Sequence, residues 1–215
     1  MRIQLIVLAK TPVPGRVKTR LCPPCTPEQA AGVAAAALAD TLDTVTATST
    51  TARVLVVDGD HPAPVGWARV VQRGGLLGER IANAYADTLV PGMASLLIGM
   101  DTPQVSPALL EAAAGRLSAD RTDAVLGEAE DGGWWALGLR DPRKAEVLRD
   151  VPMSTAETGT RTLAALRSLG LRVAQLPVLR DVDTAADALA VAALCPNDSR
   201  FALAVPQLVP SGTPA

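Results

Sequence analysis

Short apolar runs alternate with segments of helical periodicity from one end of this 215-residue chain to the other. The first run, residues 3–8, is apolar except for Gln4, which is typical of a strand buried on both faces of a parallel sheet. Alternation of this kind predicts an α/β fold in which a mostly parallel sheet is flanked by helices. Aromatic residues make up only 2% of the chain, so the core must consist mainly of Ala, Val, Leu and Ile.

The same pattern predicts where the other elements lie. Further strands are expected at residues 53–57, 70–71, 95–98, 124–126, 134–139 and 171–176. Helices are expected at residues 27–44, 79–89, 107–117, 157–168 and 185–194, three of them preceded by a Thr or Ser that can cap the helix. We therefore expect one domain over residues 1–195, followed by a loosely ordered proline-rich tail over residues 196–215.

Basic side chains are concentrated near the start of the chain. Residues 1–27 contain five Lys or Arg residues and no acid, although the net charge of the whole chain is −2. Four of the five lie in the loop after the first strand: Lys10, Arg16, Lys18 and Arg20. This loop predicts a site for a small anion such as phosphate, and Gly15 would let the backbone approach it closely. A solvated basic loop is the alternative.

A carboxylate follows another predicted strand directly. Asp101 comes after the strand at 95–98, and ligands of α/β sheets bind outside the carboxyl ends of such strands. A carboxylate there suits Mg²⁺ or Mn²⁺, because hard cations prefer oxygen ligands. Asp183 or Asp181 could complete the metal site from the opposite side. Alternatively, Asp101 is a turn residue and the other two are charges at the start of a helix.

A third group of polar residues precedes the predicted strand at 134–139. Gly132 and Gly133 would allow backbone contact with a ligand, and Asp131 beside them could act as a general base. Trp134 or Trp135 could stack on a sugar or a base. Because side chains alternate along a strand, we expect only one of the two to face a ligand.

These motifs together resemble a family of small bacterial proteins of the GT-A glycosyltransferase type. The family was long known as a domain of unknown function, and some members are assigned to arsenosugar biosynthesis. The motifs that carry the resemblance are A-K-x-P-x-P-G-x-V-K-T-R-L at 9–21, G-x-D-x-P at 99–103, D-G-G-aromatic at 131–134, S-T-x-x-T at 154–158 and D-V-D-T at 181–184. The fold is also similar to nucleotidyltransferases that make molybdenum-cofactor dinucleotides and guanylylated phospholactate.

The resemblance implies a Rossmann-like GT-A fold and a role for each motif. The residues implied in nucleotide and phosphate binding are Lys10, Gly15, Arg16, Lys18, Arg20, Gln72 and Gly78. The residues implied in metal binding are Asp101 and Asp183. The residues implied in sugar or acceptor binding are Gly132, Gly133 and Trp134, and Asp131 is implied as the catalytic base. The chain departs from the family pattern at Leu76, where an acidic residue is usual, and at Glu128, where proline is usual.

We therefore predict a metal-dependent transferase that moves a sugar from a nucleoside diphosphate-sugar to a small acceptor, with Mg²⁺ or Mn²⁺ as cofactor. The alternatives are a nucleotidyltransferase that uses a nucleoside triphosphate and a nucleotide-binding module without turnover. We expect no nucleic-acid partner, no membrane insertion and a cytoplasmic location. Cys22 and Cys25 lack the partner ligands of a zinc site, so we expect structural cysteines. The sequence does not indicate an oligomeric state.

Overall fold

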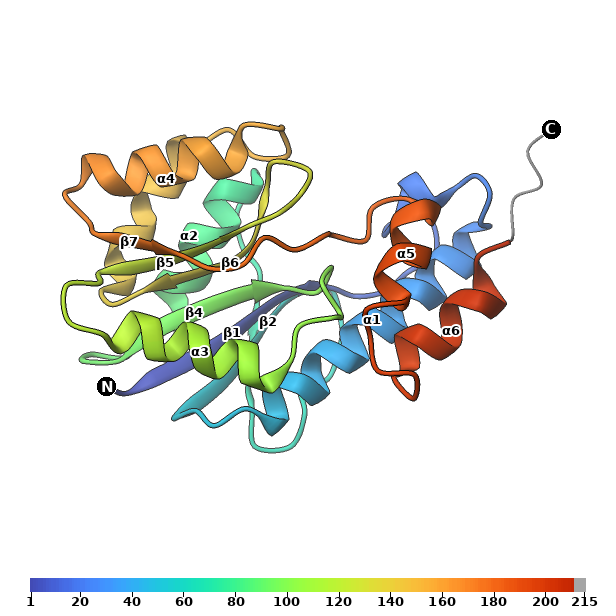
Figure 1. Cartoon of the computed structure of the whole chain (residues 1–215), viewed down its shortest axis with the longest axis horizontal. Coiled ribbons are helices and arrows are strands. Elements are labelled where there is room, and N and C mark those ends of the chain that lie inside the picture. The colour runs from blue at the N-terminus through green and yellow to red at the C-terminus, as the bar shows by residue number, and fades with distance from the viewer. Residues whose placement is uncertain (211–215) are drawn as a thin grey trace.

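A seven-stranded sheet with helices on both faces forms the centre of the computed structural model, which describes residues 1–210 (Figure 1). The strands are β1 (Ile3–Lys10), β2 (Ala52–Asp58), β3 (Ala68–Val71), β4 (Ala94–Gly99), β5 (Ala124–Glu128), β6 (Trp134–Leu139) and β7 (Val173–Gln175). Their order across the sheet is β3-β2-β1-β4-β6-β5-β7. Strand β6 runs antiparallel to both neighbours, and the other pairs are parallel. The predicted mostly parallel sheet is confirmed.

The helices form a layer on each face of the sheet. They are α1 (Pro27–Ala47), α2 (Leu77–Asp87), α3 (Pro107–Ser118), α4 (Thr158–Ser168), α5 (Ala185–Ala192) and α6 (Arg200–Leu208), with 3-10 segments η1 (Thr19–Leu21) and η2 (Pro142–Asp150). Alternate side chains of β1 serve the two layers: Leu5 and Val7 pack with α1 and α3, whereas Ile6 packs with α2, η2 and α4. This two-sided burial explains why residues 3–8 are apolar apart from Gln4.

A third, smaller core lies where η1, α1, α5 and α6 meet, and it corrects one expectation. Residues 196–215 were expected to form a loose tail, but α6 packs on α1, with Phe201 and Val205 fully buried. The Asp40 carboxylate of α1 accepts hydrogen bonds from the backbone N–H groups of Arg200 and Phe201, at 3.1 and 2.8 Å. Ser199 also caps α6 locally, because its side chain accepts the Ala202 N–H at 3.1 Å. The Asp40 contacts come from a distant helix, so the local sequence did not indicate them. Residues 211–215 lie outside the described part.

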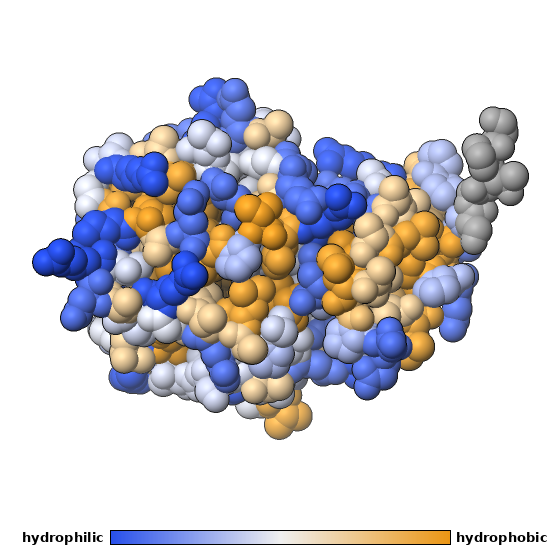
Figure 2. Space-filling view, viewed as in Figure 1, coloured by the Kyte–Doolittle hydropathy of each residue, from blue (hydrophilic) through white to orange (hydrophobic). Residues whose placement is uncertain are grey.

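The outer side of this region is apolar. Leu189 on α5, Leu194 just after it and Leu203 on α6 are each about half exposed or more, and apolar residues gather there in Figure 2. Cys22 is half-buried, Cys25 and Cys195 are buried, and all three are free thiols in or against the third core. Within residues 1–210, no helix combines the length and the apolarity that crossing a bilayer requires.

The order of the strands determines which loops meet. The chain passes from β1 to β2 and β3 on one side and then returns to β4 on the other side of β1, so the strand order reverses between β1 and β4. Leu8 of β1 pairs with Gly99 of β4, which brings the carboxyl ends of the two strands together. Ligands of α/β sheets bind at such a reversal. The basic loop and Asp101 therefore share one edge of the sheet.

Leu76 stands at the N-cap of α2 without a side-chain hydrogen bond, and its side chain is 76% exposed. Its backbone is extended (φ −77°, ψ 153°), which is the conformation an N-cap requires. We expect Leu76→Asp to stabilise the protein by about 1 kcal/mol, because the carboxylate can accept the free N–H of Glu79 and face the positive helix end. Urea denaturation measures this, with Leu76→Ala as the control; an equal gain in both variants would contradict capping.

Asp123 ties the start of β5 to β7. Its carboxylate accepts the backbone N–H of Arg172 at 2.9 Å and the guanidinium at 2.7 and 2.8 Å. These hydrogen bonds hold the pKa of Asp123 well below its usual range. The stabilisation is thus complete above the unfolded pKa of about 4 and is lost as pH falls below it towards the folded pKa. We expect Asp123→Asn to cost about 1 kcal/mol at pH 7, discounted for solvent exposure, and less at pH 2.5; urea denaturation at both pH values checks this.

Candidate functional site

A cavity of about 770 Å³ opens at the edge of the sheet where β1 and β4 end. This size lies within the usual range for ligand pockets. It is lined by most of the residues singled out in the sequence: Lys10, Arg16, Lys18, Arg20, Gln72, Asp101, Asp131, Gly133, Trp134 and Asp183. The structure thus brings together side chains up to 173 positions apart in the chain, as the strand-order reversal requires.

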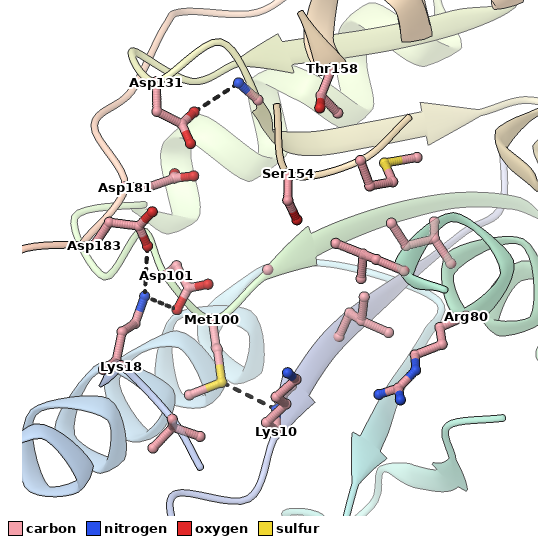
Figure 3. Close-up of a pocket in the computed structure, with 18 of the residues that line it drawn as sticks. Lys10, Lys18, Arg80, Met100, Asp101, Asp131, Ser154, Thr158, Asp181 and Asp183 are labelled. Carbon is pink, nitrogen blue, oxygen red and sulfur yellow. Dashed lines mark hydrogen bonds and ion pairs between the residues drawn. The ribbon is translucent and has the colours of Figure 1, made fainter. Parts of the chain in front are cut away.

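Lys18 lies beside Asp101 and Asp183 at the cavity (Figure 3). Its ammonium contacts the Asp101 carboxylate at 2.6 Å and that of Asp183 at 3.6 Å, and it donates a hydrogen bond to the Val182 carbonyl. The side chain is only 8% exposed. Burial by itself would lower the pKa of Lys18, but the neighbouring carboxylates, Asp101 foremost, outweigh it and raise that pKa. Lys18 is therefore a buried, permanently charged group.

Three carboxylates converge around this ammonium. Burial, and then the charges of Asp101 and Asp131, raise the pKa of Asp181 to about 7. One Asp181 oxygen is buried without a hydrogen-bond partner. Oxygen ligands with excess negative charge fit a hard divalent cation, so Asp101, Asp181 and Asp183 have the chemistry of a magnesium or manganese site. Within the described residues, however, no three His, Cys, Asp or Glu side chains stand close enough together to hold a metal ion.

The other basic side chains of the loop that line the cavity are those of Lys10, Arg16 and Arg20. Arg20 pairs with Asp183 at 2.9 Å but remains 70% exposed, so most of its guanidinium faces solvent. The Lys10 backbone N–H contacts the Met100 sulfur at 3.3 Å, which ties the end of β1 to the Asp101 loop. The Gln72 amide donates to the carbonyls of Ala9 and Val56, so Gln72 joins the ends of β1 and β2.

The segment before β6 forms a turn against α4. The Asp131 carboxylate accepts the Gly133 N–H at 2.7 Å, which aims it along the cavity wall (Figure 3). Trp135 is buried and donates to the Pro177 carbonyl at 2.9 Å, whereas Trp134 lines the cavity. The expected alternation of the two tryptophans is confirmed. The Trp134 indole N–H is buried with no partner.

Three glycines predicted to touch ligand do not line the cavity. Gly15 lies in an exposed turn with φ +74°, which a left-handed backbone rather than a ligand explains. Gly78 is buried where a methyl group would overlap the Leu148 carbonyl of η2, so it permits helix packing. Gly132 has φ +87° and lies against the Ala156 backbone. The sequence had indicated that a ligand approaches the backbone at all three glycines. At Gly78 and Gly132 the neighbouring protein backbone occupies that space, and at Gly15 the space is open.

Several lining residues were not among the predicted site residues. Arg80 of α2 pairs with Asp58 at 2.9 Å and also donates to the carbonyls of Gly74 and Gly75, so it holds that loop at the cavity. Ser154 lines the cavity with φ +59°, an unusual conformation for serine, and Thr158 lies beside it. Both belong to the S-T-x-x-T motif, which was the signal for them. No comparable pattern singled out Arg80.

Solved structures share this fold over nearly their whole length. The proposed nucleotide-diphospho-sugar transferase of Desulfovibrio desulfuricans G20 is 26% identical, with a TM-score of 0.83, and the match covers 97% of this chain and 99% of that one. Rv0371c of Mycobacterium tuberculosis H37Rv in complex with manganese is 22% identical, with a TM-score of 0.55 and coverage of 89% and 98%. CMP:2-keto-3-deoxy-manno-octonic acid synthetase in complex with CTP is 10% identical, with a TM-score of 0.59 and coverage of 97% and 100%.

These likenesses confirm the nucleotide-sugar transferase and nucleotidyltransferase type of Rossmann-like fold. No curated protein matches the chain. A family model matches residues 32–155, which is more than half of the chain, and this match confirms the resemblance that the motifs indicated. The chain belongs to the family described as "Uncharacterized protein conserved in bacteria (DUF2064)".

Proposed function

We propose that this protein transfers a sugar from a nucleoside diphosphate-sugar to a small acceptor without an anionic group, in the presence of Mg²⁺ or Mn²⁺. The observation that carries the proposal is the division of charge in one cavity. Its cations come from the basic loop and α2, namely Lys10, Arg16, Lys18, Arg20 and Arg80. Asp101 and Asp183 pair with Lys18 and Arg20 on this side. Across the cavity in Figure 3 lies the acidic wall, which carries the carboxylates of Asp131 and Asp181 and the side chains of Ser154 and Thr158.

The basic wall suits the diphosphate of the donor. Transfer of the sugar leaves negative charge on the departing diphosphate, and fixed cations beside it stabilise that charge. Arg16 and Arg20 can bind phosphate oxygens in pairs, and Lys10 supplies a point charge. A bound Mg²⁺ or Mn²⁺, held by Asp101 and Asp183, would neutralise the same charge as a Lewis acid. The manganese complex of Rv0371c supports the choice of metal for this fold.

The acidic wall suits the acceptor. Asp131 is held by the Gly133 N–H and can take the proton of an attacking hydroxyl group as the new bond to the sugar forms. The Ser154 hydroxyl can position that group by a hydrogen bond, whereas the Thr158 hydroxyl is taken up by the Pro152 carbonyl and the Thr155 N–H. Between the two walls lie the apolar side chains of Leu8, Ile81 and Leu97, which can face a sugar ring or a base. These placements support glycosyl transfer with Asp131 as the base.

The same division argues against nucleotidyl transfer to a phosphorylated acceptor. A phosphate on the acceptor would face Asp131 and Asp181, and like charges in a partly buried site repel each other strongly. Among the described residues, the acidic wall has no Lys or Arg that could bind such a phosphate. Arg180 lines the adjoining hollow, but it is already paired with Glu130 at 2.7 Å. Nucleotidyl transfer remains the second candidate, since several structures that share the fold belong to nucleotidyltransferases.

The products of the reaction test the proposal. We would incubate the protein with Mn²⁺ and, separately, with each common nucleotide-sugar or nucleoside triphosphate, with and without a mixture of neutral polyols. Chromatography would then identify what is released. Glycosyl transfer releases a nucleoside diphosphate from one nucleotide-sugar, at a rate that a polyol raises. Pyrophosphate released from a triphosphate would instead establish nucleotidyl transfer, and tight binding without either product would indicate a binding module.

A further inference from the structure

Lys18 contacts the carboxylates that are the best candidate ligands for a metal. Its ammonium lies 2.6 Å from an oxygen of Asp101 and 3.6 Å from an oxygen of Asp183. These residues are far apart in the sequence, but the backbone N–H of Val182 donates to the Asp101 carbonyl at 2.9 Å and holds their segments together. Asp101 is 44% exposed and Asp183 34% exposed, whereas Lys18 is 8% exposed. The carboxylates can therefore be reached from solvent, whereas the ammonium that pairs with them in Figure 3 is largely shielded from it.

The backbone holds Lys18 in this place. Its φ of +48° and ψ of +39° are left-handed, which costs a residue other than glycine about 1–2 kcal/mol. Such a conformation persists where the surroundings impose it, and it is common at functional sites. Here the surroundings are the Asp101 ion pair and the hydrogen bond to the Val182 carbonyl. The lysine is thus placed beside the carboxylates by the fold and is not a flexible surface group.

We propose that the Lys18 ammonium is a built-in counter-cation of Asp101 and Asp183, which a divalent metal ion must displace and which then becomes free to bind the donor diphosphate. The inference rests on the proposed function, because it assumes that these carboxylates bind the metal. The Asp101 oxygen that holds the ammonium at 2.6 Å is in contact with one cation already. Two cations at that oxygen would repel each other at short range in a partly buried site.

Displacement couples the two ligands. When the metal takes the carboxylates, it releases a positive charge at the side of the cavity where the phosphates would lie. Metal and diphosphate should then raise each other's affinity by the same factor, since coupling between two sites is reciprocal. In the absence of metal, Lys18 is engaged by protein carboxylates, and diphosphate binding is correspondingly weaker.

Replacement of Lys18 by an uncharged side chain of similar length tests the inference. We expect Lys18→Met to bind Mn²⁺ alone about tenfold more tightly than the wild type in calorimetry, and to lose the coupling between Mn²⁺ and a nucleoside diphosphate. Lys10→Met is the matched control, because it removes the same charge from the same cavity without touching Asp101. A gain of similar size in both variants, or unchanged or weaker Mn²⁺ binding by Lys18→Met, would overturn the inference.

A measurement on the wild type avoids any folding defect of the variant. The chain has three lysines, and Lys10 and Lys144 are exposed and can serve as internal references. We expect acetylation of Lys18, followed by peptide mass spectrometry, to rise at least about threefold when Mn²⁺ saturates the protein, and to fall again when a nucleoside diphosphate is added. Unchanged or lower labelling in Mn²⁺ would show that the ammonium stays in place.

The outcomes separate this inference from the proposed function. If Mn²⁺ binds with the same affinity to the wild type and to Lys18→Met, with no change in labelling, the metal site stands and only the displacement is wrong. If Mn²⁺ binds to neither protein, the metal dependence in the proposed function fails and the inference fails with it. Circular dichroism of the variant establishes whether its binding data can be interpreted.

Discussion

Asp101→Asn is expected to lower the affinity for a nucleoside diphosphate in the presence of Mn²⁺ by about 100-fold or more. Mutation of residues that only hydrogen-bond to a metal ligand already lowers metal affinity by about 10–100-fold, and Asp101 is proposed to be a ligand itself. The amide keeps the shape of the carboxylate, so packing around β4 should not change. The amide oxygen, however, lacks the negative charge that makes a carboxylate oxygen a good ligand for a hard cation. With a chelator present, the variant should bind the diphosphate no more weakly than the wild type, since Lys18 loses one of its two partners and remains charged.

Isothermal titration with and without metal measures both affinities. Asp120→Asn is a suitable control, because it removes one carboxylate from an exposed position outside the cavity. The wild type and this control should show the same dependence on Mn²⁺. If Asp101→Asn retains the full effect of Mn²⁺ on diphosphate binding, the metal is bound elsewhere. The position of Asp101 beside the basic loop would then not account for metal-dependent binding of the diphosphate.

Gly132→Ala is expected to destabilise the protein by about 2–4 kcal/mol and to abolish transfer. Gly132 has φ +87°, which alone is costly for alanine. The added methyl group would also overlap backbone atoms of Ala156, which cannot move aside as the end of a flexible side chain can. Either the turn at Asp131 or the segment before α4 must shift. Since Asp131 and Ser154 line the cavity from these two segments, the acceptor wall would be displaced.

Gly92→Ala separates the cost of the left-handed backbone conformation from the cost of the overlap with Ala156. Gly92 has a similar φ of +72°, but a methyl group there would meet nothing within 4 Å. This control should lose only about 1 kcal/mol, the conformational part, and should keep full activity. Urea denaturation and the transfer assay measure both variants. Similar losses of stability in the two would mean that the contact with Ala156 contributes nothing.

The sequence determined the local features of this protein. Apolar runs such as that of β1 predicted buried strands, because a strand covered on both faces carries mostly apolar side chains. The polar exception in this run, Gln4, is buried and donates hydrogen bonds to Thr88 and Ser95. Capping residues predicted where helices begin: Thr26 and Thr184 both form the capping boxes that their spacing allows. The basic loop and Asp101 were found by charge, and their meeting followed from the rule that ligands bind at the carboxyl ends of parallel strands.

Only the tertiary structure decided which groups from distant segments touch. The Asp40 carboxylate that adds to the local Ser199 cap of α6 comes from α1, and the backbone oxygen that a side chain at Gly78 would overlap comes from η2. Neither contact has a local pattern in the sequence. Likewise, no spacing in the sequence places the Lys18 ammonium against Asp101 and Asp183. The physical reason is that periodicity and capping act over a few residues along the chain, whereas ion pairs and close packing depend on distances in space, which arise when the whole sheet has assembled.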